Sequence, residues 1–227
     1  PQTLPEIPNL DLAAFYQPSR RAGGDYYDFF PLPEGKWGIF IADVSGHGTP
    51  AAVLMAITHS IAHSHPGPPS PPGEVLAYLN HQLVARYTSL NETFVTAFYG
   101  IYDPAERSIR YASAGHNPPR VKRCQDGELL SLDAAGGLPL GVSAEVRYDE
   151  AVEMLRTGDQ IMFYTDGITE MHNGRGELFG ARRLDDVLAG CKQEASALLD
   201  RVLSAVDSFA DGQPSDDDRT LIVARVR

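Results

Sequence analysis

Acidic side chains recur at the ends of apolar, β-rich runs in this sequence of 227 residues. The four motifs are GGDYYDFF with Asp25 and Asp28, ADVSGHG with Asp43, YTDGITE with Asp166 and Glu170, and SDDDRTLI with Asp216, Asp217 and Asp218. A strand can fix a carboxylate at the rim of a sheet, and glycine lets backbone carbonyls approach it. Oxygen ligands suit hard cations such as Mg²⁺ or Mn²⁺ better than Zn²⁺, which prefers His and Cys. A lone Asp beside a Gly is usually a turn residue, so a cation site is expected only where the motifs converge.

Hydrophobic periodicity predicts the elements that would carry these motifs. Strands are expected at 10–18, 37–44, 93–103, 108–115, 119–124, 146–155, 160–166 and 219–226. Helices are expected at 49–65, 74–87, 181–190 and 195–210. The Pro-rich stretch 66–72 must break the first helix and is expected to be a short rigid loop. Because strands run together and helices are segregated, this order favours one α+β domain, residues 1–227, with antiparallel sheets rather than a doubly wound parallel sheet.

The composition narrows the class of protein. Thirty acidic against 19 basic residues give a net charge of −11, which argues against nucleic acid or an anionic membrane surface as a partner. No apolar run approaches the roughly 18 residues of a membrane-spanning helix, and the first residues carry no signal segment, so a cytoplasmic chain is expected. The sequence begins at Pro1 rather than Met, which suggests a fragment of a longer protein with a sensor or regulatory domain upstream. Cys124 and Cys191 lie far apart and outside any C-x-x-C spacing, so buried free thiols are expected, not a disulfide or a zinc site.

Six motifs follow one another in a fixed order along nearly the whole chain. They are P-x-R-x-x-GGD-x-YD-F from Pro18 to Phe29, ADVSGHG at 42–48, AGHNPP at 114–119, G-x-PLG from Gly137 to Gly141, YTDG-x-TE at 164–170 and DD-x-T at 217–220. This ordered set resembles the SpoIIE/RsbU-type phosphatases, the bacterial branch of the PP2C-like metal-dependent phosphatases. The resemblance implies a PP2C-like α/β/β/α sandwich, in which two central antiparallel β-sheets are flanked by helices. It also implies a centre of two Mn²⁺ or Mg²⁺ ions at one edge of the sandwich.

The resemblance assigns metal ligands residue by residue. Asp43 resembles the family's bridging carboxylate, and the backbone carbonyl of Val44 falls where the family supplies a carbonyl ligand. Asp166 matches the aspartate of the family's S/T-D-G motif. Asp25 resembles the carboxylate that completes the second metal, directly or through water.

The acidic run near the C-terminus needs a choice of register. The family pattern D-D/N-x-T is fixed by Thr220 and makes Asp217 the expected ligand, with Asp218 as a neighbour that supports the ligands. His47, in the glycine turn after Asp43, could orient a metal-bound water or a carboxylate, or be purely structural. Asp28 is left open between supporting the ligands and capping a turn.

Other polar residues allow both functional and structural interpretations. Arg20 could clamp a substrate phosphate, as Arg does bidentately, or be a solvated surface residue. His116 of AGHNPP is expected to organise a loop. His59 and His63 have the four-residue spacing of a helical metal chelate, with His65 nearby, but the sequence offers no third ligand and favours an exposed or packing role.

By resemblance, the chain hydrolyses phosphoserine or phosphothreonine on a regulatory protein with a metal-activated water, and Asp43 and Asp166 act through the metals. The substrate implied is a phosphorylated STAS-domain anti-anti-sigma protein, whose dephosphorylation frees a sigma factor from its antagonist. One alternative is an inactive module that binds phosphoproteins, against which the complete aspartate set argues. Another is a metal-dependent hydrolase of small phosphoesters. A homodimer formed through the helices is left open.

Overall fold

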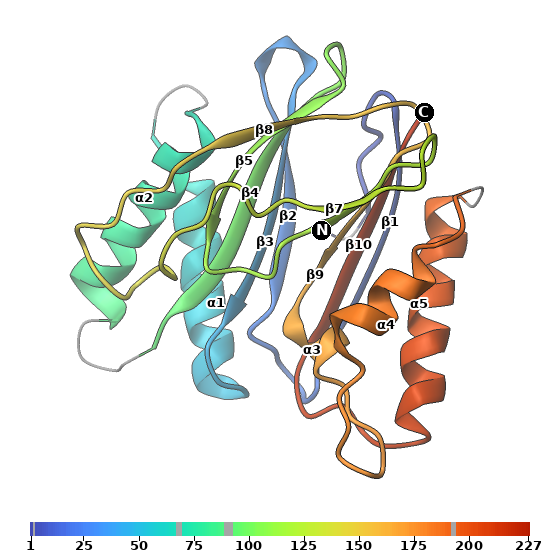
Figure 1. Cartoon of the computed structure of the whole chain (residues 1–227). Coiled ribbons are helices and arrows are strands. Elements are labelled where there is room, and N and C mark those ends of the chain that lie inside the picture. Colours follow the sequence, from blue (N-terminus) through green and yellow to red (C-terminus); the bar gives the residue numbers. More distant parts are fainter. Residues whose placement is uncertain (2, 67–69, 89–92, 192–193) are drawn as a thin grey trace.

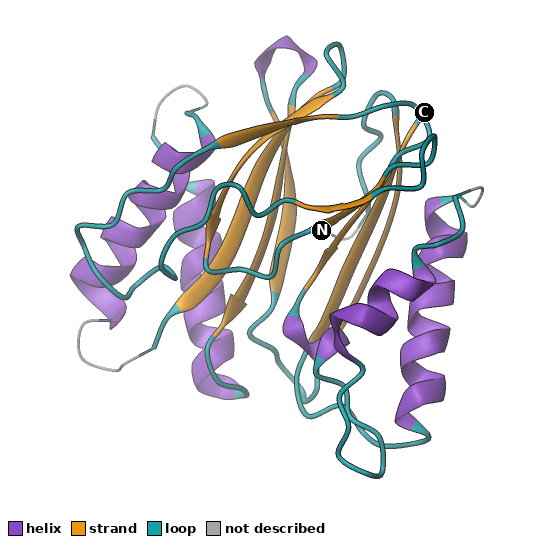
Figure 2. Cartoon of the chain, in the orientation of Figure 1, coloured by secondary structure: helices purple, strands orange, loops and turns teal. Residues whose placement is uncertain are grey.

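The fold is a four-layer sandwich of two antiparallel sheets between two layers of helices (Figures 1 and 2). The structure is a computed structural model that describes residues 1, 3–66, 70–88, 93–191 and 194–227. The loop expected at 66–72 lies partly outside these residues. The architecture otherwise confirms the α+β fold expected from the sequence.

Each sheet has five strands. The first sheet has the order β2 (Tyr26–Pro31), β3 (Trp37–Val44), β4 (Val95–Asp103), β5 (Ser108–Ala114) and β8 (Ala151–Met154). The second has the order β1 (Leu10–Gln17), β10 (Arg219–Val226), β9 (Gln160–Tyr164), β6 (Arg120–Lys122) and β7 (Leu129–Ser131). The first and last strands, β1 and β10, pair over their whole length and lie side by side at one edge of the second sheet.

Helices cover the outer face of each sheet (Figure 1). The first sheet is covered by α1 (Thr49–His63) and α2 (Pro72–Leu83), and the second by α4 (Gly180–Val187) and α5 (Ala195–Ala210). Three short helical turns complete the elements: Pro33–Gly35, the π-helical Val84–Thr88 and α3 (Asp166–Thr169). No helix among the described residues is both long and apolar enough to cross a bilayer.

Three apolar layers hold the sandwich together. The central layer packs the inner faces of the sheets, where the rings of Phe98 and Phe163 lie edge to face with centroids 5.7 Å apart. Because helices also cover the outer faces, strand β3 is buried on both sides: Ile39 and Ile41 enter the central layer, and Phe40 packs towards the helices. Such two-sided burial explains why WGIFIADV is apolar without alternation.

Some elements differ from the sequence-based expectation. Strand β2 was not among the predicted strands, since its aromatic sequence YYDFFP shows no polar alternation. The helix expected at 74–87 ends at Leu83 and continues as a π-helical turn. The strand expected at 146–155 is confined to Ala151–Met154, at the edge of the first sheet.

The prediction of two buried free thiols is wrong. Cys124 and Cys191 form a disulfide, with Cα atoms 5.3 Å apart, and both residues are partly exposed. The bond joins the turn after β6 to the segment after α4. A sequence separation of 67 residues concealed this proximity, because it depends on how α4 packs over the second sheet.

The two sheets are connected at one end of the sandwich. Residues 18–25, hereafter the crossover, run from edge strand β1 of the second sheet to edge strand β2 of the first. The antiparallel pairings also bring the C-terminal ends of β3 and β9 and the N-terminal end of β10 to this end. All four acidic motifs are therefore carried to the same edge.

The buried face of α2 gives a test of the fold. Leu79 is fully buried in the layer between α2 and the first sheet. We expect Leu79→Ala to lower the free energy of unfolding by about 2–5 kcal/mol, through lost apolar burial and the cavity left behind. Val53 on α1 is 55% exposed, so the control Val53→Ala should change the free energy of unfolding by less than about 1 kcal/mol. Urea unfolding of wild type, Leu79→Ala and Val53→Ala measures the two changes. Equal losses of stability in the two variants would contradict this packing.

Candidate active site

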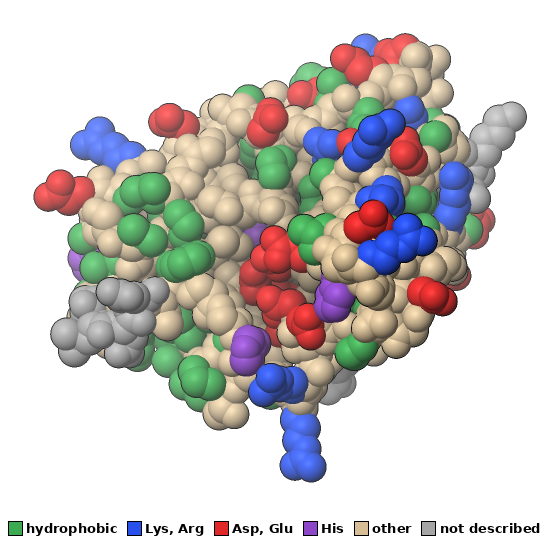
Figure 3. Space-filling model, turned by 60° about the horizontal axis from the view of Figure 1, so that its bottom comes forward, with side chains coloured by type: hydrophobic (Ala, Val, Ile, Leu, Met, Phe, Trp, Pro, Cys, Tyr) green, Lys and Arg blue, Asp and Glu red, His purple; other side chains and the backbone are tan. Residues whose placement is uncertain are grey.

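Four aspartates converge where the strands end. Asp43 is near the end of β3, Asp166 begins α3 two residues after the end of β9, Asp25 directly precedes β2 and Asp217 lies just before β10. The carboxylate of Asp43 lies close enough to those of Asp25, Asp166 and Asp217 to be repelled by all three. Figure 3 shows acidic side chains gathered in a hollow at this end of the molecule. We call these four residues the acidic cluster.

The acidic cluster is electrostatically strained. Burial raises the pKa of Asp43 and of Asp25 well above the ordinary range, and neighbouring carboxylates raise both further. Burial, together with repulsion from Asp217, raises the pKa of Asp166 to about 6. In the part of the chain that the structure describes, no Lys or Arg forms an ion pair with any of the four. The missing positive charge is what divalent cations would supply.

Asp25 is held by hydroxyl groups of the opposite sheet. It is buried, and its Oδ2 accepts hydrogen bonds from Thr165 Oγ1 at 2.7 Å and Thr220 Oγ1 at 2.6 Å. The backbone N–H of Thr220 in turn donates to Thr165 Oγ1 at 3.0 Å. Thr165, which sequence reasoning missed, and Thr220, which it used only to fix the register, therefore orient this carboxylate. The hydroxyl residues directly before Asp166 and three residues after Asp217 were the only signal in the sequence.

Adjacent aspartates before β10 have different roles. Asp218 is buried, and its carboxylate accepts the backbone N–H groups of Ser19 at 2.7 Å and Gly24 at 2.5 Å. It thereby fastens the crossover, at whose end Asp25 lies. Asp217 is partly exposed and interacts with the acidic cluster. The carboxylate of Asp218 is thus engaged by the crossover, and Asp217 as a metal ligand stays a prediction.

Two glycines allow the crossover to approach the site. A Cβ atom on Gly23 would lie 2.3 Å from Asp218 Oδ2, so a side chain here would displace the carboxylate that fastens the crossover. A Cβ atom on Gly24 would lie 3.2 Å from the backbone carbonyl oxygen of Val44. That carbonyl therefore faces the crossover across a gap that a side chain would fill.

The other candidates lie at different distances from the cluster. His47 is exposed and lines a hollow of about 510 Å³ with Glu170 and Asp217. Burial raises the pKa of Asp217, and the nearby His47 offsets part of that rise. Arg20 is exposed on the crossover. Asp28 does not join the cluster: it lies on the face of β2 that packs towards α1, where His63 Nε2 is 2.8 Å from its Oδ2. The structure therefore gives no support for Asp28 beside the expected metals.

His116 is buried behind the site. Its Nδ1 is 2.9 Å from the hydroxyl of Thr96, which lies opposite Asp43 in the β3–β4 ladder. The preceding residue, Gly115, bridges to Ala97 of β4. His116 thus holds the 115–119 loop against the strand beside the cluster, as expected for a residue that organises a loop.

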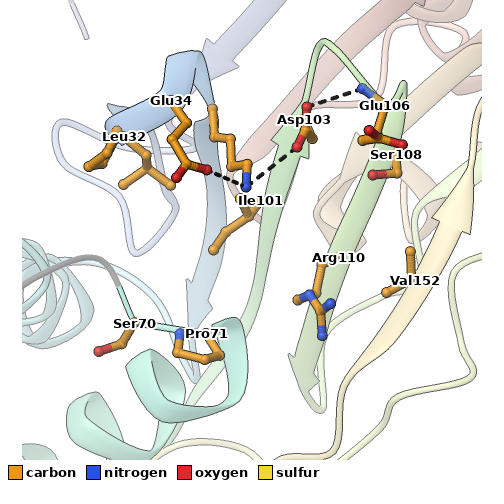
Figure 4. Close-up of a pocket in the computed structure, with 12 residues that line it drawn as sticks. Leu32, Glu34, Ser70, Pro71, Ile101, Asp103, Glu106, Ser108, Arg110 and Val152 are labelled. Atoms are coloured by element: carbon orange, nitrogen blue, oxygen red, sulfur yellow. Dashed lines mark hydrogen bonds and ion pairs between the residues drawn. The ribbon is translucent and has the colours of Figure 1, made fainter.

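Another hollow, of about 490 Å³, lies at the opposite end of β3 and β4 (Figure 4). The Nζ atom of Lys36, which lines this hollow, lies 3.0 Å from a carboxylate oxygen of Glu34 and 3.5 Å from one of Asp103, so its charge is already paired. No member of the acidic cluster lines it. The candidate active site is therefore the acidic end.

The comparison with known proteins agrees with this geometry. The family model for Stage II sporulation protein E (SpoIIE) matches residues 33–227. The chain belongs to the SpoIIE family. Among curated relatives, the phosphoserine phosphatase RsbU of Bacillus subtilis is 34% identical over 175 residues, which cover 77% of this chain and 51% of RsbU. The phosphoserine phosphatase RsbP of the same species is 26% identical over 163 residues, covering 71% of this chain and 40% of RsbP. The chain thus spans about half or less of the length of these SpoIIE-family relatives.

Solved structures share the fold. The SiaA-PP2C domain of Pseudomonas aeruginosa has a TM-score of 0.83 at 21% identity and covers 95% of this chain and 86% of that chain. The PP2C phosphatase domain of SpoIIE from Bacillus subtilis has a TM-score of 0.78 at 22% identity, covering 96% and 61%. These similarities confirm the PP2C-like sandwich that the sequence motifs of the SpoIIE family implied.

The two neighbouring aspartates provide a prediction in the metal-free protein. We expect Asp218→Asn to lower the free energy of unfolding by about 1–3 kcal/mol, because the amide replaces a charged acceptor of two buried N–H groups. Asp217→Asn should instead raise it by up to about 1 kcal/mol, because it relieves repulsion within the acidic cluster. Urea unfolding in EDTA measures both changes. A loss of stability in Asp217→Asn that matches the loss in Asp218→Asn would refute the division of roles.

His116 provides a pH prediction. Burial lowers its pKa to about 4, against about 6.5 in the unfolded chain. The unfolded chain therefore binds a proton that the folded one resists, so this residue's contribution to stability is lost as pH falls from about 6.5 towards 4, by at most roughly 3 kcal/mol. The carboxyl groups with raised pKa values have the opposite effect, because they make the folded chain more stable as pH falls. The contribution of His116 to the pH dependence of stability is therefore isolated by comparing wild type with His116→Gln. That variant should lose less stability than wild type over this window, whereas exposed His81→Gln should follow wild type.

Proposed function

We propose that this chain is a metal-dependent protein serine/threonine phosphatase. The observation that carries the proposal is the acidic cluster: four carboxylates with raised pKa values at one edge of a PP2C-like sandwich, without a basic partner among the described residues. The names of RsbU and RsbP, both phosphoserine phosphatases, support the same reaction class. Hydrolysis of a phosphomonoester needs charge neutralisation at phosphorus and an oriented water.

The residues of the cluster fit two hard cations. Asp43, which interacts with the other three carboxylates, is the proposed bridging ligand, and Asp25, Asp166 and Asp217 are the other carboxylates that would hold the ions. The backbone carbonyl of Val44, directly after Asp43, is the proposed carbonyl ligand, and its oxygen lies 3.2 Å from where a Cβ atom on Gly24 would stand. Two Mn²⁺ or Mg²⁺ ions bound there would neutralise phosphoryl charge and activate the attacking water.

The remaining residues of the chain would position the ligands and the substrate. Thr165 and Thr220 hold Asp25 in place by hydrogen bonds, and Asp218 fixes the crossover. His47 borders the hollow on the solvent side and is suited to contact the phosphate or the water. Arg20, exposed on the crossover that ends at Asp25, is the proposed bidentate phosphate clamp.

We propose a phosphoserine or phosphothreonine on a STAS-domain regulator of a sigma-factor antagonist as the substrate. The support is the similarity to RsbU and RsbP, together with an acidic site edge that is open to solvent (Figure 3). The larger size of these relatives supports a regulatory domain elsewhere in the full protein. A module that only binds phosphoproteins is the alternative, but it gives no reason to gather four carboxylates that have no Lys or Arg ion-pair partner among the described residues.

The test is hydrolysis of a phosphoserine peptide and of a phosphorylated STAS protein in Mn²⁺. We expect EDTA, Asp43→Asn and Asp166→Asn each to reduce kcat/KM by about 100-fold or more, because each weakens the metal centre. Asp186→Asn, an exposed position on α4, is the matched control and should retain activity.

Thermal unfolding supplies a readout independent of turnover. Mn²⁺ should raise the Tm of the wild type by mass action and raise that of Asp43→Asn much less. A raised Tm without turnover of either substrate would favour the binding module. No effect of Mn²⁺ on Tm or activity would rule out the proposed metal centre.

A further inference from the structure

A second group of potential metal ligands lies on the outer face of the first sheet. His59 and His63 are one turn apart on α1, with ring centroids 4.4 Å from each other. The ring of His59 packs edge-on against Tyr26, with centroids 5.1 Å apart, and the ring of His63 lies 5.1 Å from that of Phe30. Both imidazoles are therefore held against edge strand β2.

Strand β2 supplies the third ligand that the sequence did not reveal. Asp28 Oδ2 is 2.8 Å from His63 Nε2, and one ligand atom from each of Asp28, His59 and His63 lies within 4.8 Å of the others. The hydroxyl of Tyr26 donates to the same carboxylate oxygen at 2.9 Å, and the N–H of Phe29 donates to Oδ1 at 2.8 Å. Such outer contacts fix the orientation of a ligating carboxylate.

We propose that Asp28, His59 and His63 form a binding site for a borderline transition-metal ion, Zn²⁺ in the first place. Two imidazole nitrogens and one carboxylate oxygen are a ligand set that Zn²⁺ accepts and that Mg²⁺ and Mn²⁺ do not favour. With bonds of about 2.1 Å, the ligand atoms of a tetrahedral zinc are roughly 3.4 Å apart. The present separations need only small side-chain rotations, in which the bond between His63 and Asp28 is exchanged for bonds to the ion.

The site is accessible to an ion from solvent. The side chain of His63 is 46% exposed and that of Asp28 is 15% exposed, and His59 is also exposed. Three protein ligands leave one position for water. The ion would tie β2 to α1, which otherwise meet here through ring contacts and the one hydrogen bond.

This site is separate from the acidic cluster. Asp25 and Asp28 belong to one motif, but Asp25 binds hydroxyls of the second sheet whereas Asp28 faces α1. The two sites also differ in ligand chemistry, since the cluster offers only oxygen. The inference therefore does not rest on the proposed phosphatase activity.

The experiment is Zn²⁺ titration by calorimetry of the chain carrying Asp43→Asn and Asp166→Asn, in excess Mg²⁺, so that the acidic cluster does not compete. We expect one equivalent of Zn²⁺ to bind, and His59→Ala, His63→Ala and Asp28→Asn each to weaken binding at least about tenfold. His65→Ala and His81→Ala remove imidazoles outside the site and should leave the affinity unchanged. Co²⁺ in place of Zn²⁺ should give visible absorption bands that His59→Ala abolishes.

Two results would overturn the inference: no Zn²⁺ binding, or binding of the same strength in His59→Ala and His63→Ala. Circular dichroism of the metal-free variants shows that each is folded. His59 is exposed, and within the described part of the chain it packs through ring contacts and makes no hydrogen bond with its side chain. His59→Ala therefore keeps the test decisive even if loss of the bond between His63 and Asp28 unfolds the other variants.

Discussion

The candidate active site depends on one buried carboxylate that joins the two sheets. Asp25 precedes the first strand of one sheet. Its Oδ2 accepts hydrogen bonds from the hydroxyl groups of Thr165, directly after β9, and of Thr220 in β10 of the other sheet. The partners are 140 and 195 residues away in the chain. These contacts are non-local, as is the β1–β10 pairing beside them, so the site is assembled by the global fold and by no local segment.

The same end of the sandwich holds several carboxylates close together, and their mutual repulsion lowers the stability of the folded chain. Burial and mutual repulsion disfavour the ionised forms of Asp25 and Asp43. The cost is tolerated because strands buried on both faces hold their ends rigidly, and because Asp218 is committed to the crossover instead of the cluster. A conflict of this kind between local stability and the whole fold is typical of functional sites.

The sequence was sufficient for the main elements and for the motifs that carry Asp43, Asp166 and Asp217. Each stands beside a long apolar strand whose periodicity is a local property. The sequence was insufficient wherever a residue's partner is distant in the chain. This holds for the hydroxyl groups that donate to Asp25, for the backbone N–H groups that donate to Asp218 and for the disulfide between Cys124 and Cys191. Strand β2 was missed for a related reason, because its two aromatic faces meet different layers and so show no polar alternation.

Strand β2 also explains how one short motif can serve two kinds of chemistry. Successive side chains of a strand point to opposite faces, so an odd spacing of three residues places Asp25 and Asp28 on opposite sides of the first sheet. The inner side meets the hydroxyls and carboxylates of the second sheet, which favour hard cations. The outer side meets α1, where a four-residue spacing presents His59 and His63. The nitrogen ligands that make this face suitable for zinc are thus supplied by the helix that follows the Asp43 loop, and the strand contributes only the carboxylate.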